Sequence, residues 1–275
     1  MLTAERRRHI LEILATDERA EVVDLAARFD VSESTIRRDL ESLARSGALE
    51  RTRGGAVPAL RLEPSYAQKR RSHEVEKLAI ARAAARLVEP GASVLLDSGT
   101  TTLSVARALR GVRDLTVATT SLPIALELAD RARVIVVGGT LRDRTVALVG
   151  PLAERAIDQL HVDVAFVGTN GVAVGAGFTT PTWEEASVKA RMIGAATTAV
   201  VVADGSKVGE ITFARICDLG DVDLLLTDAS APPAELAALR TAGLRIEVAP
   251  RIVAADGRAV TPDGPAVATG SGEVA

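Results

Sequence analysis

The sequence predicts an α/β protein in which a small helical unit precedes a larger domain built on a mostly parallel sheet. Three observations lead to this prediction. Residues 1–57 contain three short stretches whose apolar residues recur at helical spacing. From residue 75 onward, amphipathic stretches alternate with short apolar runs, as expected of helices that cover a parallel sheet buried on both faces. Residues 58–73, with two prolines and a basic run, read as a linker.

Composition is that of an ordinary globular protein. The 275 residues suit about two domains, and 47% are hydrophobic while 25% are charged. No stretch is long and apolar enough to span a bilayer, and the N-terminal residues lack the pattern of a signal peptide. The single cysteine, Cys217, leaves no intrachain disulfide to form. We therefore expect a cytoplasmic protein without a membrane partner.

The N-terminal unit is expected to hold three helices and a small hairpin. The helices are predicted over residues 3–16, 22–29 and 33–45. Ser32 is placed to cap the third helix, and Gly47 to end it. Residues 48–57 then read as a β-hairpin, or wing, with the pair Gly54-Gly55 at its turn.

The third predicted helix has an apolar stripe, which includes Ile36 and Leu40, and an arginine-bearing face opposite to it. Arginine at the start of such a helix can read guanine in the major groove, and arginines on a wing can reach the DNA backbone. The net charge of −3 does not by itself indicate a nucleic-acid partner, so this prediction depends on where the arginines point. The same spacing also fits a three-helix bundle with a solvated charged face. The candidate DNA-binding residues are Ser32, Ser34, Thr35, Arg37, Arg38, Arg45, Arg51, Arg53, Gly54 and Gly55.

The literal residues also resemble a known family. The string Val31-Ser32-Glu33-Ser34-Thr35-Ile36-Arg37-Arg38-Asp39-Leu40, followed by Arg51-Thr52-Arg53-Gly54-Gly55-Ala56, is similar to the winged helix-turn-helix of the DeoR family of bacterial regulators. The resemblance extends over nearly the whole chain apart from its C-terminal tail. It implies a dimer or higher oligomer on repeated operator half-sites. It also implies an effector that is a phosphorylated sugar or a related intermediate.

The second domain, residues 74–253, is predicted to be doubly wound. Strands are expected at 93–96, 115–118, 134–137, 164–167, 199–202 and 224–226. Helices are expected at 75–88, 101–109, 153–159, 184–197 and 234–242. The tail, residues 254–275, is rich in Gly, Ala, Asp and Pro, which is typical of disorder.

Polar turns follow several of the predicted strands, and the carboxyl ends of parallel strands meet at one edge of a sheet. The turn at 97–102 opens a helix, so its backbone N–H groups and the helix dipole favour an anion such as phosphate. Glu185 and Lys189 fit either a ligand site or a surface ion pair four residues apart. The candidate effector-binding residues are Asp97, Ser98, Gly99, Thr100, Thr101, Thr102, Gly139, Asn170, Glu185, Lys189, Asp204 and Lys207.

These turns resemble the DeoR-type sensor domain, which is itself similar to ribose-5-phosphate isomerase. The matching strings are Asp97-Ser98-Gly99-Thr100-Thr101, Gly138-Gly139, Glu185-Ala186-Ser187-Val188-Lys189 and Asp204-Gly205-Ser206-Lys207. The resemblance implies that the first of these is a phosphate loop. Thr120 departs from the family, which commonly has Asn at this position.

The sequence therefore predicts a repressor of a sugar or carbohydrate operon that binds double-stranded operator DNA as a homo-oligomer, a dimer or tetramer, under control of a phosphorylated sugar. One alternative is an isomerase-like enzyme that uses Glu185, Asp204 and Lys207, and another is an N-terminal module that binds something other than DNA. The outward arginines favour the regulator, so we expect no catalysis and no cofactor. The three histidines are isolated from one another and from the cysteine, so we expect no metal site.

Overall fold

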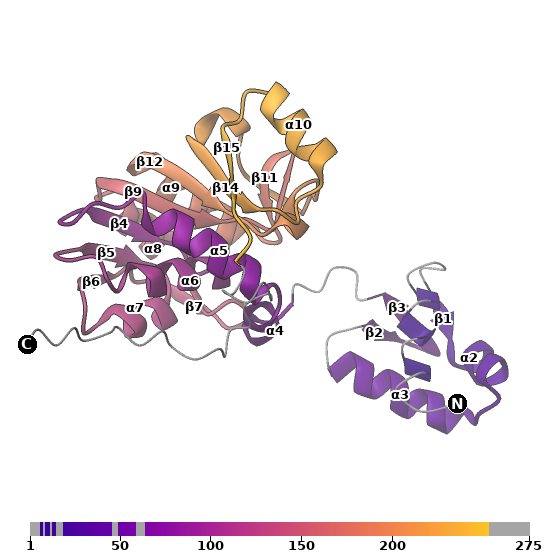
Figure 1. The fold of residues 1–275 in the computed structure, drawn as a ribbon. Coiled ribbons are helices and arrows are strands. Elements are labelled where there is room, and N and C mark those ends of the chain that lie inside the picture. The colour runs from indigo at the N-terminus through magenta and orange to yellow at the C-terminus, as the bar shows by residue number, and fades with distance from the viewer. Residues whose placement is uncertain are drawn as a thin grey trace, which may run out of the picture. The chain divides into compact units, whose positions relative to one another are not determined.

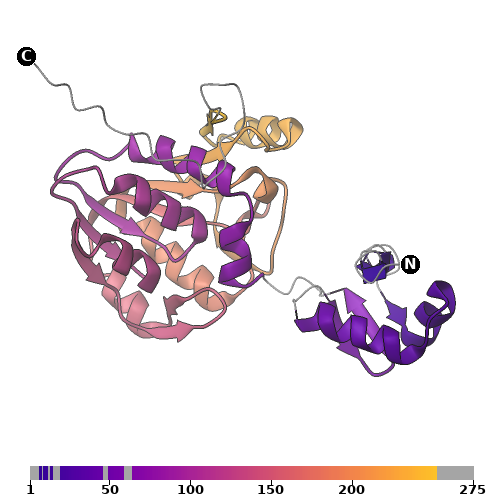
Figure 2. The ribbon, with the colours of Figure 1, turned by 60° about the horizontal axis from the view of Figure 1, so that its bottom comes forward.

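The computed structural model describes residues 6–7, 9–11, 13–14, 19–45, 49–58 and 64–252. The chain divides into two compact units, Met1–Pro64 and Ser65–Ala275, which we treat separately (Figures 1 and 2). No helix of the described residues is long and apolar enough to cross a membrane. The predicted tail lies outside the described residues.

The N-terminal unit contains the predicted helix-turn-helix and wing. Its elements are β1 (Ala20–Glu21), α2 (Val22–Phe29), α3 (Glu33–Arg45), β2 (Leu49–Thr52) and β3 (Gly55–Pro58), preceded by helical residues at 9–11 and 13–14. Both helices that follow β1 have the predicted bounds. α2 ends because Asp30 adopts a left-handed conformation, with φ of 51°, which turns the chain toward α3. The unit has its own core, which includes Ile10, Leu25 and Leu40.

The wing is a three-stranded sheet, although only its hairpin was predicted. β3 lies between β1 and β2, and both pairings are antiparallel. Gly54 occupies the hairpin turn with φ of +99°, a conformation that other residues rarely adopt. A two-residue strand such as β1 carries too little periodicity to be detected in the sequence.

The larger unit is a three-layer α/β fold around a parallel sheet of seven strands in the order β15-β14-β12-β9-β4-β5-β6 (Figure 1). The strands are β4 (Ser93–Leu96), β5 (Thr116–Thr119), β6 (Arg133–Val136), β9 (Val162–Gly168), β12 (Ala196–Val202), β14 (Leu224–Asp228) and β15 (Ile246–Ala249). Six of them are the predicted runs. β15 was missed because its pattern, Ile246-Glu247-Val248-Ala249, is not continuously apolar.

Helices cover both faces of this sheet. α5 (Glu74–Ala85), α6 (Thr100–Leu109) and α7 (Leu122–Leu128) pack in one apolar cluster, which includes Ile80 and Phe166. α8 (Pro151–Ile157), α9 (Trp183–Gly194) and α10 (Pro233–Thr241) pack in the other, which includes Met192 and Val201. Two small antiparallel sheets complete the unit: β7 (Thr140–Arg142) with β8 (Ala147–Val149), and β10 (Gly171–Ala173) with β11 (Gly177–Thr180) and β13 (Ala214–Cys217).

The predicted linker, residues 58–73, needs correction. Its second half forms a helix, α4 (Tyr66–Arg71), which belongs to the larger unit. Ser65 and Gln68 form a reciprocal capping box: the Gln68 amide donates to Ser65 Oγ (3.3 Å), and the Ser65 amide donates to Gln68 Oε1 (2.9 Å). Prolines and a basic run in this stretch are typical of a linker, and only the side-chain bonds of the capping box distinguish it from one.

Candidate functional site

The DNA-facing prediction rests on α3, and the helix has the two faces that the sequence analysis expected. Ile36 and Leu40 are fully buried, whereas Ser34, Arg38 and Arg45 on the opposite face are exposed. At the N-terminus of α3, Ser32 Oγ lies 2.9 Å from Thr35 Oγ1 and 2.8 Å from Ser34 Oγ. This places a hydroxyl cluster at the positive end of a helix dipole, beside exposed arginines.

The predicted DNA-binding residues differ in their exposure and in the residues that they contact. Arg37 forms an ion pair with Glu33 (2.7 Å), four residues earlier on α3. Arg51 and Arg53 are exposed on the wing, as is Gly54. Gly55 is buried, and a Cβ there would lie 2.1 Å from the Ala20 carbonyl oxygen. The absence of a side chain at Gly55 is therefore required for β3 to approach β1.

Asp39 is a structural residue that the sequence analysis did not single out. Its carboxylate is only 2% exposed and accepts hydrogen bonds from Arg6 Nε (2.7 Å) and Arg7 Nε (2.9 Å). These two charge-assisted bonds tie the first helical segment to α3 and so orient the arginine-bearing face. The sequence separation of more than thirty residues left no local signal for this contact.

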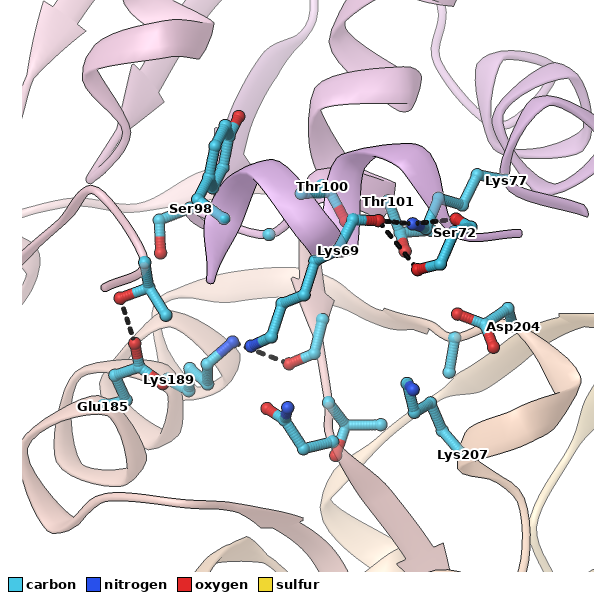
Figure 3. Close-up of a pocket in the computed structure, with 17 residues that line it drawn as sticks. Lys69, Ser72, Lys77, Ser98, Thr100, Thr101, Glu185, Lys189, Asp204 and Lys207 are labelled. Carbon is cyan, nitrogen blue, oxygen red and sulfur yellow. Dashed lines mark hydrogen bonds between the residues drawn. The ribbon is translucent and has the colours of Figure 1, made fainter. Parts of the chain in front are cut away.

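In the larger unit, a cavity of about 70 Å³ lies at the carboxyl edge of the parallel sheet (Figure 3). Nine of the twelve predicted effector residues line it: Ser98, Gly99, Thr100, Thr101, Asn170, Glu185, Lys189, Asp204 and Lys207. They come from four separate chain segments, each of which follows a strand or begins a helix. Asp97, Thr102 and Gly139 are not among the lining residues.

Asp97 lies behind the cavity and organises the turn before α6. Its Oδ1 accepts from the Gly99 amide (2.5 Å) and Thr102 Oγ1 (2.8 Å), and its Oδ2 accepts from the Gly168 amide (2.8 Å) and the Lys189 ammonium. Burial raises the pKa of this carboxyl, but the Lys189 charge and these hydrogen bonds outweigh burial, so its pKa lies below the ordinary value. Asp97 and Thr102 therefore shape the site instead of facing a ligand.

Glu185 is held in a similar way. Its Oε1 accepts from Thr145 Oγ1 (2.6 Å) and Arg142 Nη1 (3.0 Å), and its Oε2 accepts from Thr180 Oγ1 (3.1 Å). Glu185 and Lys189 are both less than a tenth exposed, and each forms an ion pair with a residue far away in the sequence, Glu185 with Arg142 and Lys189 with the buried Asp97. The reading of these two residues as a solvent-exposed surface pair is therefore wrong.

Gly139 was assigned to the site and lies elsewhere. Its φ is +145°, and a Cβ at this position would lie 2.7 Å from the Val149 carbonyl oxygen and 3.2 Å from Ala153 Cβ. This glycine permits the chain that leaves β6 to pass close to β8 and α8. Its role is packing.

Eight lining residues were not among the predicted effector residues: Tyr66, Lys69, Ser72, Lys77, Thr145, Gly168, Thr169 and Ala203. Three of them come from α4 and its end, which had been read as linker. Lys77, on the first turns of α5, is only 4% exposed, and its ammonium donates to the Ser72 carbonyl (2.6 Å) and to the Lys69 carbonyl. Burial lowers the pKa of Lys77 to about 8, while the Asp204 charge opposes that shift. Nothing in a single amphipathic pattern distinguishes this lysine from a surface lysine.

The resulting cavity is cationic around the N-terminus of α6. Lys69, Lys77 and Lys207 line the same cavity as Thr100 and Thr101, whose amides begin the helix (Figure 3). Asp204 accepts from the Ser206 amide (3.2 Å), which forms the turn that positions Lys207. Such a set of positive groups and hydroxyls is suited to an anionic, hydroxylated ligand. Within the described ranges, no group of His, Cys, Asp and Glu is arranged to hold a metal ion.

Comparisons with known proteins agree with both units. Residues 6–59 match the family model of the DeoR-like helix-turn-helix domain, and residues 72–229 match that of the DeoR C terminal sensor domain. The chain is 38% identical to the HTH-type transcriptional regulator GlpR of Haloferax volcanii, over 90% of this chain and 98% of that protein. It is 33% identical to the putative aga operon transcriptional repressor of Escherichia coli O157:H7, over 89% of this chain and 93% of the relative.

Among solved structures, ribose 5-phosphate isomerase A from Methanocaldococcus jannaschii is similar to half of the chain. The identity is 21% and the TM-score 0.37, with 50% of this chain and 55% of the isomerase covered.

Proposed function

Because this chain belongs to the DeoR family of helix-turn-helix transcriptional regulators, we propose that it is a repressor whose hold on operator DNA is controlled by a phosphorylated sugar. The observation that carries the proposal is the cavity that Lys69, Lys77 and Lys207 line together with the N-terminus of α6. The phosphate would lie against the Thr100 and Thr101 amides, where the helix dipole and the lysine charges add. The hydroxyls of the sugar would face Asn170 and the polar groups of the opposite wall.

The DNA partner follows from the N-terminal unit. Exposed Arg38 and Arg45 on α3 would face the major groove, and Arg51 and Arg53 on the wing would contact the backbone. One winged helix contacts few base pairs, so we propose a homo-oligomer that presents two or four of them to repeated half-sites in the cytoplasm. One relative is named as a putative operon repressor, and this name supports the proposal that DNA binding by this chain represses transcription.

We propose further that the chain binds its ligand without chemical conversion. The isomerase-like alternative would use Glu185 and Asp204, with Lys207, as its acid and base groups. Glu185 accepts three hydrogen bonds, and Asp204 accepts two from Ser206, one from its amide (3.2 Å) and one from its hydroxyl. Both carboxylates are thus held by neighbouring donors. This commitment supports a sensor.

The test combines a thermal-shift screen of sugar phosphates with a gel-shift assay on the DNA upstream of the chain's own operon. We expect one sugar phosphate to raise the melting temperature and to change operator affinity, whereas the same sugar without phosphate does neither. The bound compound should be recovered unchanged after prolonged incubation. Conversion to an isomer would support the enzyme instead, and failure to retard operator DNA under any condition would contradict the repressor.

A further inference from the structure

The two edges of the seven-stranded sheet differ in how they are protected. Figure 1 shows β15 and β6 at opposite ends of the larger unit. β15 carries Glu247, whose carboxylate pairs with Arg86 (3.5 Å), and a charge on an edge strand discourages pairing with another chain. β6 reads Arg133-Val134-Ile135-Val136, with no proline; its one charge is on the exposed first residue, Arg133, and Ile135 and Val136 are exposed after it.

The backbone of β6 offers unpaired hydrogen-bonding groups on its open side. The amides of Arg133 and Val137 donate to β5, at the Leu115 carbonyl (3.0 Å) and the Thr119 carbonyl (2.9 Å). Because successive residues of a strand alternate in direction, the N–H and C=O groups of Val134 and Val136 point away from β5. No further strand of the described chain pairs with that side.

Exposed aliphatic side chains lie on β6 and on the chain segments that precede and follow it. Twelve large hydrophobic residues are exposed within the described part of the chain, and half of them lie between residues 122 and 152: Leu122, Leu126, Ile135, Val136, Leu141 and Leu152. We call these six the β6 edge patch. Val136 shares the face of Val134, which packs with the cluster that contains α7, and Leu126 of α7 is 80% exposed. Ile135 lies on the opposite face, with buried Val137. The chain that follows Val137 passes close to α8, on which Leu152 is exposed.

We propose that the β6 edge patch is where two copies of this chain associate, with the two β6 strands antiparallel across a two-fold axis, so that the sheets of both subunits become continuous. A strand edge is self-complementary in this arrangement, since each copy supplies the same alternating donors and acceptors. The axis passes beside Ile135, so that Val134 pairs with the partner's Val136. Leu126 and Leu152 then close over the junction from the two sides.

The size of the patch suits a second copy. A stable dimer buries about 800 Å² on each subunit, and about two thirds of a homodimer interface is apolar. The six large aliphatic side chains are between 37% and 80% exposed and supply on the order of 500 Å² of apolar surface. This area is close to two thirds of about 800 Å². A monomer would leave this surface and four backbone polar groups to water.

This inference specifies the contact within the proposed homo-oligomer, and its test needs neither DNA nor effector. Val136→Lys places a charge at the junction, and Phe213→Lys places the same charge on a residue that is 85% exposed, directly before β13 and outside the β6 edge patch. We expect V136K to halve the molar mass measured by light scattering while its melting temperature stays near that of wild type. F213K should associate as wild type does. A V136K protein that keeps the molar mass of wild type, or a monomeric wild type, would overturn the proposal.

A cysteine cross-link tests the strand pairing directly and decides the matter if V136K fails to fold. In antiparallel strands, residues opposite each other at a non-hydrogen-bonded pair have Cα atoms about 4.5 Å apart, which suits a disulfide. With Cys217 replaced by alanine, Ile135→Cys should form a covalent dimer on mild oxidation. Val174→Cys, at an exposed position outside the β6 edge patch, should stay monomeric on a denaturing gel. An I135C protein that remains uncrosslinked would overturn the proposed register and the interface with it.

Discussion

The Tyr66 amide donates a hydrogen bond to the Arg144 carbonyl oxygen (2.9 Å). Tyr66 is the first residue of α4, directly after the boundary between the two units, and Arg144 lies in the turn between β7 and β8. The next residue of that turn, Thr145, lines the cavity and donates to Glu185 (2.6 Å). The wall of the cavity and the start of α4 are thus connected through two hydrogen bonds.

The first prediction concerns this connection. Thr145→Val keeps the shape of the side chain but removes its hydrogen bond to the Glu185 carboxylate. A hydrogen bond to a charged group contributes about 1.5–3 kcal/mol, so we expect a lower free energy of unfolding and a weaker effector response. Denaturant unfolding and a gel-shift titration with effector measure the two. Thr241→Val, which removes an exposed hydroxyl bond to Ala237 on α10, should change neither; an unaltered T145V would refute the connection.

The second prediction concerns base reading. Arg38→Ala removes an exposed side chain from α3 without touching its buried stripe. Loss of a bidentate base contact costs about 1–3 kcal/mol of operator affinity. Arg28→Ala, at an exposed position on α2, is the matched control and should bind nearly as wild type does. Binding should be compared on operator and on random duplex at equal salt. A loss of equal size on both would mark Arg38 as a phosphate contact.

The third prediction separates sensing from DNA binding. Thr101→Glu places a carboxylate at the N-terminus of α6, inside the cavity, where it repels the phosphate of the effector. We expect the variant to bind operator and to lose its response to the sugar phosphate. Ser104→Glu carries the same charge on the same helix but does not line this cavity, so its response should persist. A T101E protein that responds at the wild-type effector concentration would place the phosphate elsewhere.

The fourth prediction concerns pH. Burial lowers the pKa of Lys77 to about 8, below its ordinary value of 10.5. The unfolded chain therefore holds this proton over a range in which the folded chain has released it, so the contribution of Lys77 to the free energy of unfolding rises between pH 8 and pH 10.5. An anionic effector favours the charged lysine, so effector affinity should fall as pH rises through 8. Isothermal titration of wild type and of Lys77→Met measures this.

In K77M, the decline in affinity across this pH range should be absent and binding weaker at pH 7. A wild-type affinity that stays constant from pH 7 to pH 9 would show that Lys77 does not face the anion. Direct measurement of the proton uptake on binding, from titrations in two buffers, gives an independent check of the sign.

Much of this protein was determined by local sequence pattern alone. The bounds of α2 and α3, six of the seven strands in the parallel sheet and five of its covering helices follow from periods of 3.6 and 2 residues and from caps. Nine of the twelve effector candidates lie together because parallel strands end at one edge, whatever the details of packing. Such features depend on neighbours within a few residues, which the sequence displays directly.

Tertiary structure alone decided what each polar side chain does. Asp39, Asp97 and Glu185 each accept two hydrogen bonds from residues more than thirty positions away, so these carboxylates stabilise the fold. Lys77 and residues of α4 line the cavity because the chain turns between α4 and α5. No residue spacing within either helix predicts this turn toward the cavity. Burial removes water from a charged group, so the group needs hydrogen-bond or ion-pair partners within the protein. The fold supplies these partners from residues far apart in the sequence. The sequence names the residues at the edge of the sheet, but only their packing decides which of them face the ligand.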